Sequence, residues 1–238
     1  MIRRFQCCLQ KNFEMVTRFY NRTTAGKQLA QRLFSYANRP GTLVVALPRG
    51  GVPVAYEVAK ALHLPLDICV VRKLGLPSYK ELAMGAIAAD GLCVLNDELI
   101  SALSISDATI KQVARQEAKE LARRDRLYRR NCPRPSLKNR TLILIDDGIA
   151  TGSTMQAAIS ILKKRGAEHI VVAVPVAPYA VCQELNKSVD RVVCLATPSP
   201  FNAIGLWYDN FTQTTDETVT QLLSELQPHK VSSSIVHS

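Results

Sequence analysis

The sequence contains seven cysteines, but it lacks the regular cysteine spacings of a metal site or a disulfide framework. No C-x-x-C motif occurs, and Cys7-Cys8 is the only adjacent pair, which argues against structural zinc and against a disulfide framework. The four histidines are dispersed along the chain, so neither a zinc cluster nor a Ser-His-Asp triad is indicated. The cysteine pattern is typical of a reducing compartment, and we expect a cytoplasmic protein.

Long apolar runs are also missing. No stretch approaches the roughly 20 apolar residues that a membrane-spanning helix needs. The N-terminus is basic but has neither the apolar segment nor the cleavage site of a secretory signal. We therefore expect no membrane partner. With 47% hydrophobic residues the chain can bury a full core. We expect one folded domain at residues 23–227, between an N-terminal extension (1–22) and a disordered tail (228–238).

Negative charge is in deficit, and the formal net charge is +10. Much of the excess lies in one basic run that ends a predicted helix over residues 107–130. One interpretation is a solvated helix end, where cations interact favourably with the helix dipole. The other is a surface for nucleic acid or a protein partner, which is possible but not favoured. The cations of the run are Arg123, Arg124, Arg126, Arg129, Arg130, Arg134, Lys138 and Arg140.

Short apolar segments alternate with amphipathic ones through most of the chain. Such alternation predicts an α/β fold with a mainly parallel central sheet flanked by helices. Strands are predicted near 43–47, 66–71, 141–145, 170–176 and 191–196. Helices are predicted near 23–37, 52–62, 107–130, 155–165, 178–186 and 216–226.

The most informative stretch follows the predicted strand 141–145. Asp146 and Asp147 stand at its carboxyl end, where open α/β sheets bind ligands. The Gly/Thr/Ser-rich segment 148–154 then leads into a helix, an arrangement that suits a phosphate. Neither the Walker A pattern nor the dinucleotide fingerprint is present. Two carboxylates would repel the phosphate itself, but they suit the hydroxyls of an attached sugar or a metal ion.

Two further segments carry candidate site residues. Pro48-Arg49-Gly50-Gly51 follows the first predicted strand, and its arginine offers a forked donor for phosphate oxygens. The segment from Arg72 to Glu81 is basic and contains Gly and Pro, which predicts an exposed, mobile loop. Downstream, Asp90-Gly91 is a hairpin turn signal.

The run from Leu142 to Thr154 resembles the phosphoribosyl-diphosphate (PRPP) signature of the type I phosphoribosyltransferases. Pro48 to Gly51 stands where that family binds pyrophosphate, and Arg72-Lys73 resembles the Arg-Lys pair of its orotate member. The resemblance implies a type I phosphoribosyltransferase-like fold with a flexible hairpin lid and a small hood. It implies transfer of 5-phosphoribosyl from PRPP to a nitrogenous base, with Mg²⁺ and release of pyrophosphate. No feature identifies the base.

The resemblance also implies residue roles. Asp146 and Asp147 would hold the ribose hydroxyls, directly or through Mg²⁺, and offset the positive charge that develops at the anomeric carbon. Arg49 and Lys73 would act on the departing pyrophosphate. Further substrate-binding residues are implied in the three loops: Gly50, Gly51, Arg72, Gly148, Ala150, Thr151, Gly152, Ser153 and Thr154.

Aromatic residues gather between residues 197 and 211, although they are scarce elsewhere. In the family a variable hood covers the base, and aromatics often stack on it. We place the core at 40–197 and the hood at 198–211 plus the N-terminal helix, with Trp207 and Tyr208 as candidate base contacts. The alternative is that these aromatics pin a C-terminal segment to the core.

Two functions of different class remain open. The first is a phosphoribosyltransferase acting as a homodimer. The second is a PRPP- or nucleotide-sensing regulator with a nucleic-acid or protein partner, which the basic run keeps open. The presence of Arg49, Lys73 and both aspartates favours the enzyme.

Overall fold

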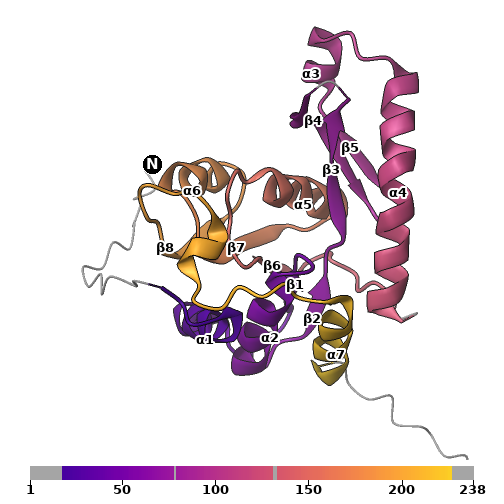
Figure 1. Ribbon diagram of the computed structural model, residues 1–238. Helices are drawn as coiled ribbons and strands as arrows, with labels where there is room; N and C mark the ends of the chain where they lie inside the picture. Colours follow the sequence, from indigo (N-terminus) through magenta and orange to yellow (C-terminus); the bar gives the residue numbers. More distant parts are fainter. Residues whose placement is uncertain (1–17, 78, 131–132, 227–238) are drawn as a thin grey trace, which may run out of the picture.

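The structure is a computed structural model that describes residues 18–77, 79–130 and 133–226. Its centre is a parallel five-stranded sheet in the order β2-β1-β6-β7-β8 (Figure 1). The strands are β1 (Thr42–Ala46), β2 (Leu66–Ile68), β6 (Thr141–Ile145), β7 (His169–Val176) and β8 (Arg191–Ala196). The predicted α/β class and parallel sheet are confirmed. The strand predicted at 66–71 is shorter in the sheet than expected, because Val71 begins a strand of a second sheet.

Side chains of β1 and β6 alternate between two apolar cores. Val44 and Ile143 pack on the face covered by α1 (Arg22–Arg32), α2 (Gly51–Leu62) and α7 (Asp216–Leu226). Val45 and Leu144 pack on the face covered by α5 (Ser153–Lys164) and α6 (Tyr179–Asn186). Because both faces are covered, the strands are apolar throughout rather than alternating. Figure 1 shows the two helical layers on either side of the sheet.

Strands β1 and β6 run in register from Thr42 opposite Thr141 to Ala46 opposite Ile145. The amide of Leu47 donates to the carbonyl of Ile145 at 2.9 Å, so the pairing extends one residue further. The loops that follow the two strands therefore leave the sheet side by side. This register brings the Arg-Gly-Gly loop next to the two aspartates.

A second, antiparallel sheet rises from one side of the first (Figure 1). Its strands are β3 (Val71–Leu76), β4 (Tyr79–Ala88) and β5 (Cys93–Leu95), and it packs against α4 (Asp107–Arg129); α3 (Asp97–Ala102) follows β5. Residues 90 and 91 form the predicted turn between β4 and β5, with Gly91 at φ +84°.

The prediction of a loop from Arg72 to Glu81 is wrong for most of that segment. Residues 72–76 and 79–81 belong to strands β3 and β4, which pair with each other. Their register shifts on both sides of Gly75, so an irregular strand carries the glycine that suggested a loop. Whether this hairpin closes as a lid stays a prediction.

Several boundaries differ from the predicted ones. Helix α1 ends at Arg32 and is followed by a 3-10 turn, η1 (Phe34–Tyr36), instead of continuing to residue 37. Phe19 is 1% exposed, and its backbone hydrogen-bonds with Trp207, the last residue of η2 (Ile204–Trp207), and with Asp209. Phe19 therefore packs with the fold, although it was assigned to the extension. Helix α3 was not predicted. The proposed tail at 228–238 lies outside the described residues.

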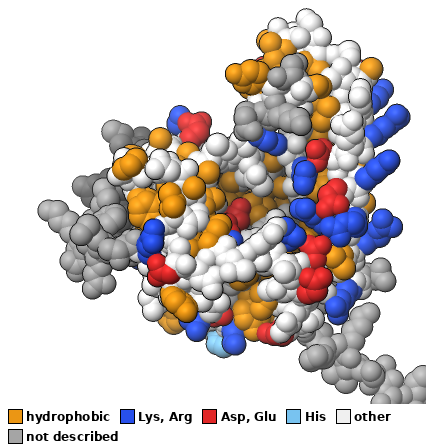
Figure 2. Space-filling model, in the orientation of Figure 1, with side chains coloured by type: hydrophobic (Ala, Val, Ile, Leu, Met, Phe, Trp, Pro, Cys, Tyr) orange, Lys and Arg blue, Asp and Glu red, His pale blue; other side chains and the backbone are white. Residues whose placement is uncertain are grey.

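Cations of the basic run are in large part paired within the molecule. Arg129 is 8% exposed and binds Asp67 at 2.7 Å and the carbonyl of Ile68 at 2.8 Å, which ties α4 to β2. Arg123, Arg124 and Arg134 also pair with carboxylates. Figure 2 shows lysine and arginine side chains along the edge that α4 forms. These four arginines are therefore engaged by carboxylates of the fold, and Arg129 is buried, whereas the first interpretation expected a solvated helix end.

Among the residues that the structure describes, no helix combines the length and apolar character required to cross a membrane.

Candidate active site

Asp146 and Asp147 lie where β6 ends, and they are held differently. The Oδ1 atom of Asp146 accepts the amide of Asp147 at 2.8 Å. The Oδ2 atom of Asp147 accepts Nε of Arg22 at 2.7 Å, and both of these side chains are 11% exposed. The second carboxylate is therefore part of a shielded ion pair, which sequence reasoning did not foresee.

Arg22 is fixed on three sides. It is the first residue of α1, its guanidinium carbon lies 3.9 Å from the ring centroid of Phe211, and its Nη1 atom donates to the carbonyl of Thr212 at 2.8 Å. Stacking on an aromatic face and a carbonyl acceptor stabilise a desolvated guanidinium. Arg22 thus joins the start of the fold, the hood and the acidic pair.

Tyr208 is 4% exposed, and its hydroxyl donates to the backbone carbonyl of Asp147 at 2.5 Å. Its ring packs between Phe19 and Phe211. This burial leaves no ring face for a base, so Tyr208 has the pinning role that the sequence left as the alternative. Trp207 is half-buried, and its buried Nε1 has no hydrogen-bond partner within the described chain.

Glycines in the two loops allow close packing around the aspartates. A Cβ atom on Gly50 would lie 2.0 Å from Oδ2 of Asp147, and one on Gly51 would lie 2.7 Å from the carbonyl oxygen of Ile145. The sequence suggested that these glycines let a ligand approach; in the structure they let the Arg-Gly-Gly loop approach the acidic end of β6. The Pro48–Arg49 peptide bond in this loop is cis.

The last two residues of segment 148–154 begin helix α5. Gly152 precedes the helix with φ +81°, and no side chain caps the helix start. The hydroxyls of Thr151 and Ser153 lie 3.1 Å apart, and Ala150 is exposed beside them. Amide groups at an uncapped helix start, flanked by hydroxyls, form a favourable environment for an anion. Gly148 instead packs on Ile204.

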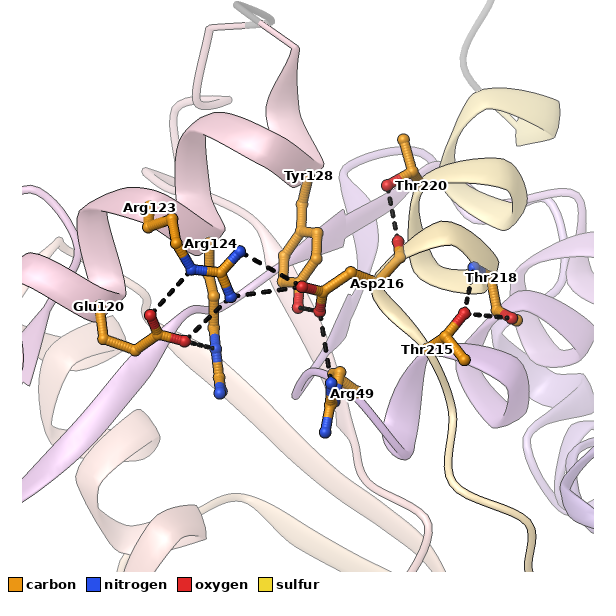
Figure 3. Close-up of polar contacts among 9 residues, drawn as sticks. All are labelled: Arg49, Glu120, Arg123, Arg124, Tyr128, Thr215, Asp216, Thr218 and Thr220. Carbon is orange, nitrogen blue, oxygen red and sulfur yellow. Dashed lines mark hydrogen bonds and ion pairs between the residues drawn. The ribbon is translucent and has the colours of Figure 1, made fainter.

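Arg49 points toward a polar cluster between α4 and α7 (Figure 3). Its Nη1 atom lies 3.6 Å from Oδ1 of Asp216. The same carboxylate accepts the hydroxyl of Tyr128 at 2.6 Å and contacts Arg123 at 3.3 Å. Asp216 therefore holds an arginine that was expected to bind pyrophosphate, and no sequence motif marked it.

Lys73 lies on β3 and lines two clefts beside the phosphate-type loop. The larger cleft, about 730 Å³, also reaches Pro48 and Thr154. The smaller, about 360 Å³, reaches Thr151 and Ser153. The structure thus brings Lys73 to the predicted site. Arg72 is bonded to Glu117 on α4 at 3.0 Å and ties the hairpin to that helix.

The comparisons with known proteins agree with this geometry. A family model described as "Phosphoribosyl transferase domain" matches residues 14–209. The chain belongs to the phosphoribosyltransferase family. Two Mycobacterium tuberculosis proteins, from strains CDC 1551 and H37Rv and each named "Putative phosphoribosyl transferase", are 47% identical over 205 residues, 86% of this chain. The match covers 46% of each of them, so the chain spans about half the length of these curated relatives.

Solved structures resemble this phosphoribosyltransferase to different degrees. The protein TT1426 from Thermus thermophilus aligns with a TM-score of 0.80 and 39% identity, over 88% of this chain and 99% of that one. A purine phosphoribosyltransferase from Pyrococcus horikoshii aligns with a TM-score of 0.41 and 18% identity, over 76% and 92% of the two chains. The second likeness has a TM-score below 0.5 and carries no argument about this chain.

The electrostatics of the acidic pair are dominated by burial. Burial and the neighbouring charge of Asp147 raise the pKa of Asp146 well above its usual range. Burial also raises the pKa of Asp147, and the Arg22 guanidinium opposes that rise. A cation or hydroxyl donors beside these two carboxyl groups would therefore stabilise their charged form.

A metal ion would find oxygen ligands here but no complete protein site. Within the described part of the chain, no group of three or more His, Cys, Asp or Glu side chains is placed to hold a metal. Two carboxyl groups beside a phosphate-type loop fit Mg²⁺, which binds through one or two carboxylates, substrate phosphates and water. The oxygen donors at this site are thus compatible with Mg²⁺ that is held mainly by a bound phosphate compound.

Proposed function

We propose that this chain transfers the 5-phosphoribosyl group of PRPP to a nitrogenous base and releases pyrophosphate, with Mg²⁺ as cofactor. One observation carries the proposal: the acidic pair, the uncapped start of α5 and the Arg-Gly-Gly loop meet at one edge of the sheet. Each part suits a different portion of PRPP. The shared register of β1 and β6 is what brings them together.

The 5-phosphate is assigned to residues 150–154. The hydroxyls of Thr151 and Ser153 and the amides that open α5 would donate to its oxygens. Residue 154 reaches the larger cleft, so a phosphate here leaves the rest of the substrate directed toward the hairpin.

The ribose is assigned to the acidic pair. As the bond from the anomeric carbon to pyrophosphate breaks, positive charge develops on the ribose ring, and the nitrogen of the base then forms the new bond to that carbon. Asp146 and Asp147 would accept hydrogen bonds from the ribose hydroxyls and stabilise that charge. Gly50 contacts Asp147 and helps to keep it in place.

Pyrophosphate leaves with negative charge that cations must neutralise. Lys73 on β3 lines the larger cleft, and Arg49 directly follows Pro48, which lines the same cleft. Arg49 would exchange the 3.6 Å ion pair with Asp216 for phosphate oxygens. Mg²⁺ would supply further neutralisation of the pyrophosphate oxygens, and Asp146 and Asp147 are the residues that would help to hold it.

The base is not assigned. Tyr208 is buried, so Trp207 is the remaining aromatic candidate of the two proposed from sequence. Pairing of four arginines in the basic run removes much of the observation that kept a nucleic-acid-binding regulator open. A cytoplasmic location and a homodimer stay predictions, and sedimentation velocity of the purified chain tests the second.

The test is isothermal titration of PRPP with Mg²⁺ into wild type and into Asp146→Asn/Asp147→Asn. We expect micromolar binding by wild type and its loss in the double variant. Circular dichroism of both proteins separates loss of binding from loss of fold. Absence of binding by folded wild type at millimolar PRPP would refute the function, whereas binding justifies a screen of bases for pyrophosphate release.

A further inference from the structure

The opposite edge of the sheet holds a second polar cavity, remote from the site described above. Its volume is about 470 Å³, within the range of small-molecule pockets. Three connections line it: residues 38–42 before and at the start of β1, residues 63–65 before β2, and residues 138–140 before β6. Because the strands are parallel, these amino-terminal ends lie a full strand length from Asp146, about 13 Å at 3.3 Å per residue.

Positive charge gathers in this cavity without a matching acid. Arg39, Lys138 and Arg140 line it together with His63, and none of its lining residues is Asp or Glu. Within the described chain these cations form no ion pair that would satisfy them, in contrast to Arg123, Arg124, Arg129 and Arg134. Lys138 and Arg140 are the two cations of the basic run that line this cavity.

A buried hydroxyl lies in the wall of this cavity. Thr42 lines the cavity and is 2% exposed, yet its Oγ1 atom has no hydrogen-bond partner in the described structure. A buried polar atom without a partner costs free energy, and such atoms are rare in folded proteins. The Thr42 hydroxyl is itself shielded from the cavity, so it marks an unsatisfied polar group in the cavity wall and is not counted among the groups that would contact a ligand.

Backbone geometry turns the three connections toward one another. Asn38, Gly41, His63 and Asn139 all have positive φ, at +54°, +74°, +52° and +59°. Three of these are not glycine, and that conformation is uncommon for such residues. Residues with left-handed backbone conformation therefore occur in all three connections that line the cavity.

We propose that this cavity binds a small phosphate-bearing anion. The guanidinium groups of Arg39 and Arg140 present paired donors that match phosphate oxygens, and Lys138 completes the donor set. No Phe, Tyr or Trp lines the cavity, so it lacks the stacking surface that single-stranded nucleic acids use. The shared chemistry is the phosphate group, and inorganic phosphate, pyrophosphate and a nucleoside monophosphate are its three candidate sources.

The experiment is isothermal titration of phosphate, pyrophosphate and AMP into the full chain and into three variants. Lys138→Gln/Arg140→Gln removes two cavity cations, and Thr42→Val removes the orphan hydroxyl with little change of shape. Lys163→Gln/Lys164→Gln is the control, because it removes two exposed charges at the end of α5 that do not line the cavity. Thermal unfolding confirms that each variant is folded.

We expect at least one probe to bind wild type, with affinity lowered about tenfold or more in Lys138→Gln/Arg140→Gln, since each charge-assisted bond is strong. Thr42→Val should weaken binding less, because that hydroxyl is shielded from the cavity, and the control should stay within about twofold because exposed charges are screened. The two-cation variant decides the result if Thr42→Val does not fold.

Three results overturn the proposal. They are no binding of any probe at millimolar concentration, equal binding by both double variants, and binding only of a long polyanion such as single-stranded RNA. Because pyrophosphate and the phosphate of AMP also suit the candidate active site, each titration is repeated in the Asp146→Asn/Asp147→Asn background, and only binding that Lys138→Gln/Arg140→Gln weakens counts for this cavity.

Discussion

Two ion pairs flank the candidate active site. In one of them the acid belongs to a motif recognised in the sequence, and in the other the arginine does. At the end of β6, Arg22 from outside the motifs holds Asp147 at 2.7 Å, with both side chains 11% exposed. At the β1 loop, Asp216 from outside the motifs lies 3.6 Å from Arg49, and the pair is 19% and 30% exposed. The first is a short, shielded bond and part of the fold, whereas the second is loose enough for a phosphate to replace.

The two regions also titrate in opposite senses. Burial and Asp147 raise the pKa of Asp146, so its contribution to stability is present below the unfolded pKa of about 3.9 and is lost as pH rises. The Tyr128 hydroxyl, followed by Arg123, lowers the pKa of Asp216, so its contribution is present above that pKa and is lost as pH falls. At neutral pH the surroundings of Asp146 thus disfavour its negative charge, whereas the partners of Asp216 between α4 and α7 stabilise its negative charge.

The largest effect is expected for Asp147→Asn. We expect the Kd for PRPP to rise roughly 100-fold, because two charge-assisted bonds of about 1.5–3 kcal/mol each are weakened. Asparagine can still accept Nε of Arg22, so the free energy of unfolding should fall by only about 1–3 kcal/mol. Titration calorimetry and urea unfolding measure the two quantities.

The control for that variant is Asp209→Asn, which changes a carboxylate 51% exposed and 3.9 Å from Arg18. It should leave both values unchanged. Near-normal PRPP binding by Asp147→Asn would remove Asp147 from the ribose site.

Arg22→Gln tests the shielded pair from its other side. Breaking a buried pair leaves an uncompensated carboxylate, and we expect a loss of about 3 kcal/mol in the free energy of unfolding. Removal of the guanidinium raises the pKa of Asp147 further, so PRPP binding should weaken near neutral pH. The loss should recover as pH rises, because the carboxyl group then ionises.

Titrations between pH 6 and 9 check this, with Arg18→Gln, an exposed arginine, as the matched control. A loss of affinity that is the same at every pH would show that Arg22 acts on the fold alone.

Asp216→Asn should have a smaller effect of opposite sign on binding. Release of Arg49 from a partly exposed pair, worth about 0.2–1 kcal/mol, should tighten PRPP binding by up to about fivefold. Loss of the charged acceptor for Tyr128 should lower stability by about 1–2 kcal/mol at pH 7, and this loss should shrink as pH falls through the lowered pKa of the wild-type carboxyl. Weaker PRPP binding would mean that Asp216 positions Arg49 for substrate.

The local parts of this arrangement could be predicted from sequence, and the long-range parts could not. Strands 141–145 and 191–196 and helix 216–226 match their predicted bounds, because apolar runs and turn residues specify them locally. Asp146 and Asp147 follow a buried strand and so could be placed at the sheet edge. Arg22 is 125 residues from its partner and lies in no motif, and Asp216 has the ordinary pattern of an acid at a helix start.

The hairpin shows a second kind of limit. Gly75 and Pro77 indicated a loop, but pairing with β4 outweighs the local preference of residues 72–76 for irregular structure. The role of Gly50 was likewise out of reach, because the atom that excludes a Cβ there belongs to Asp147, 97 positions later in the chain.

Tyr208→Phe should have the smallest effect, and it separates the acidic pair from base recognition. The variant loses one hydrogen bond to the carbonyl of Asp147, so the free energy of unfolding should fall by about 1 kcal/mol. Affinity for PRPP should stay within about twofold, because the Arg22–Asp147 bond remains. The preference among bases should also persist, since the Tyr208 ring is packed between Phe19 and Phe211 and has no free face. A changed preference, with unfolding unaltered, would return Tyr208 to the base site and assign the pinning of Asp147 to Arg22 alone.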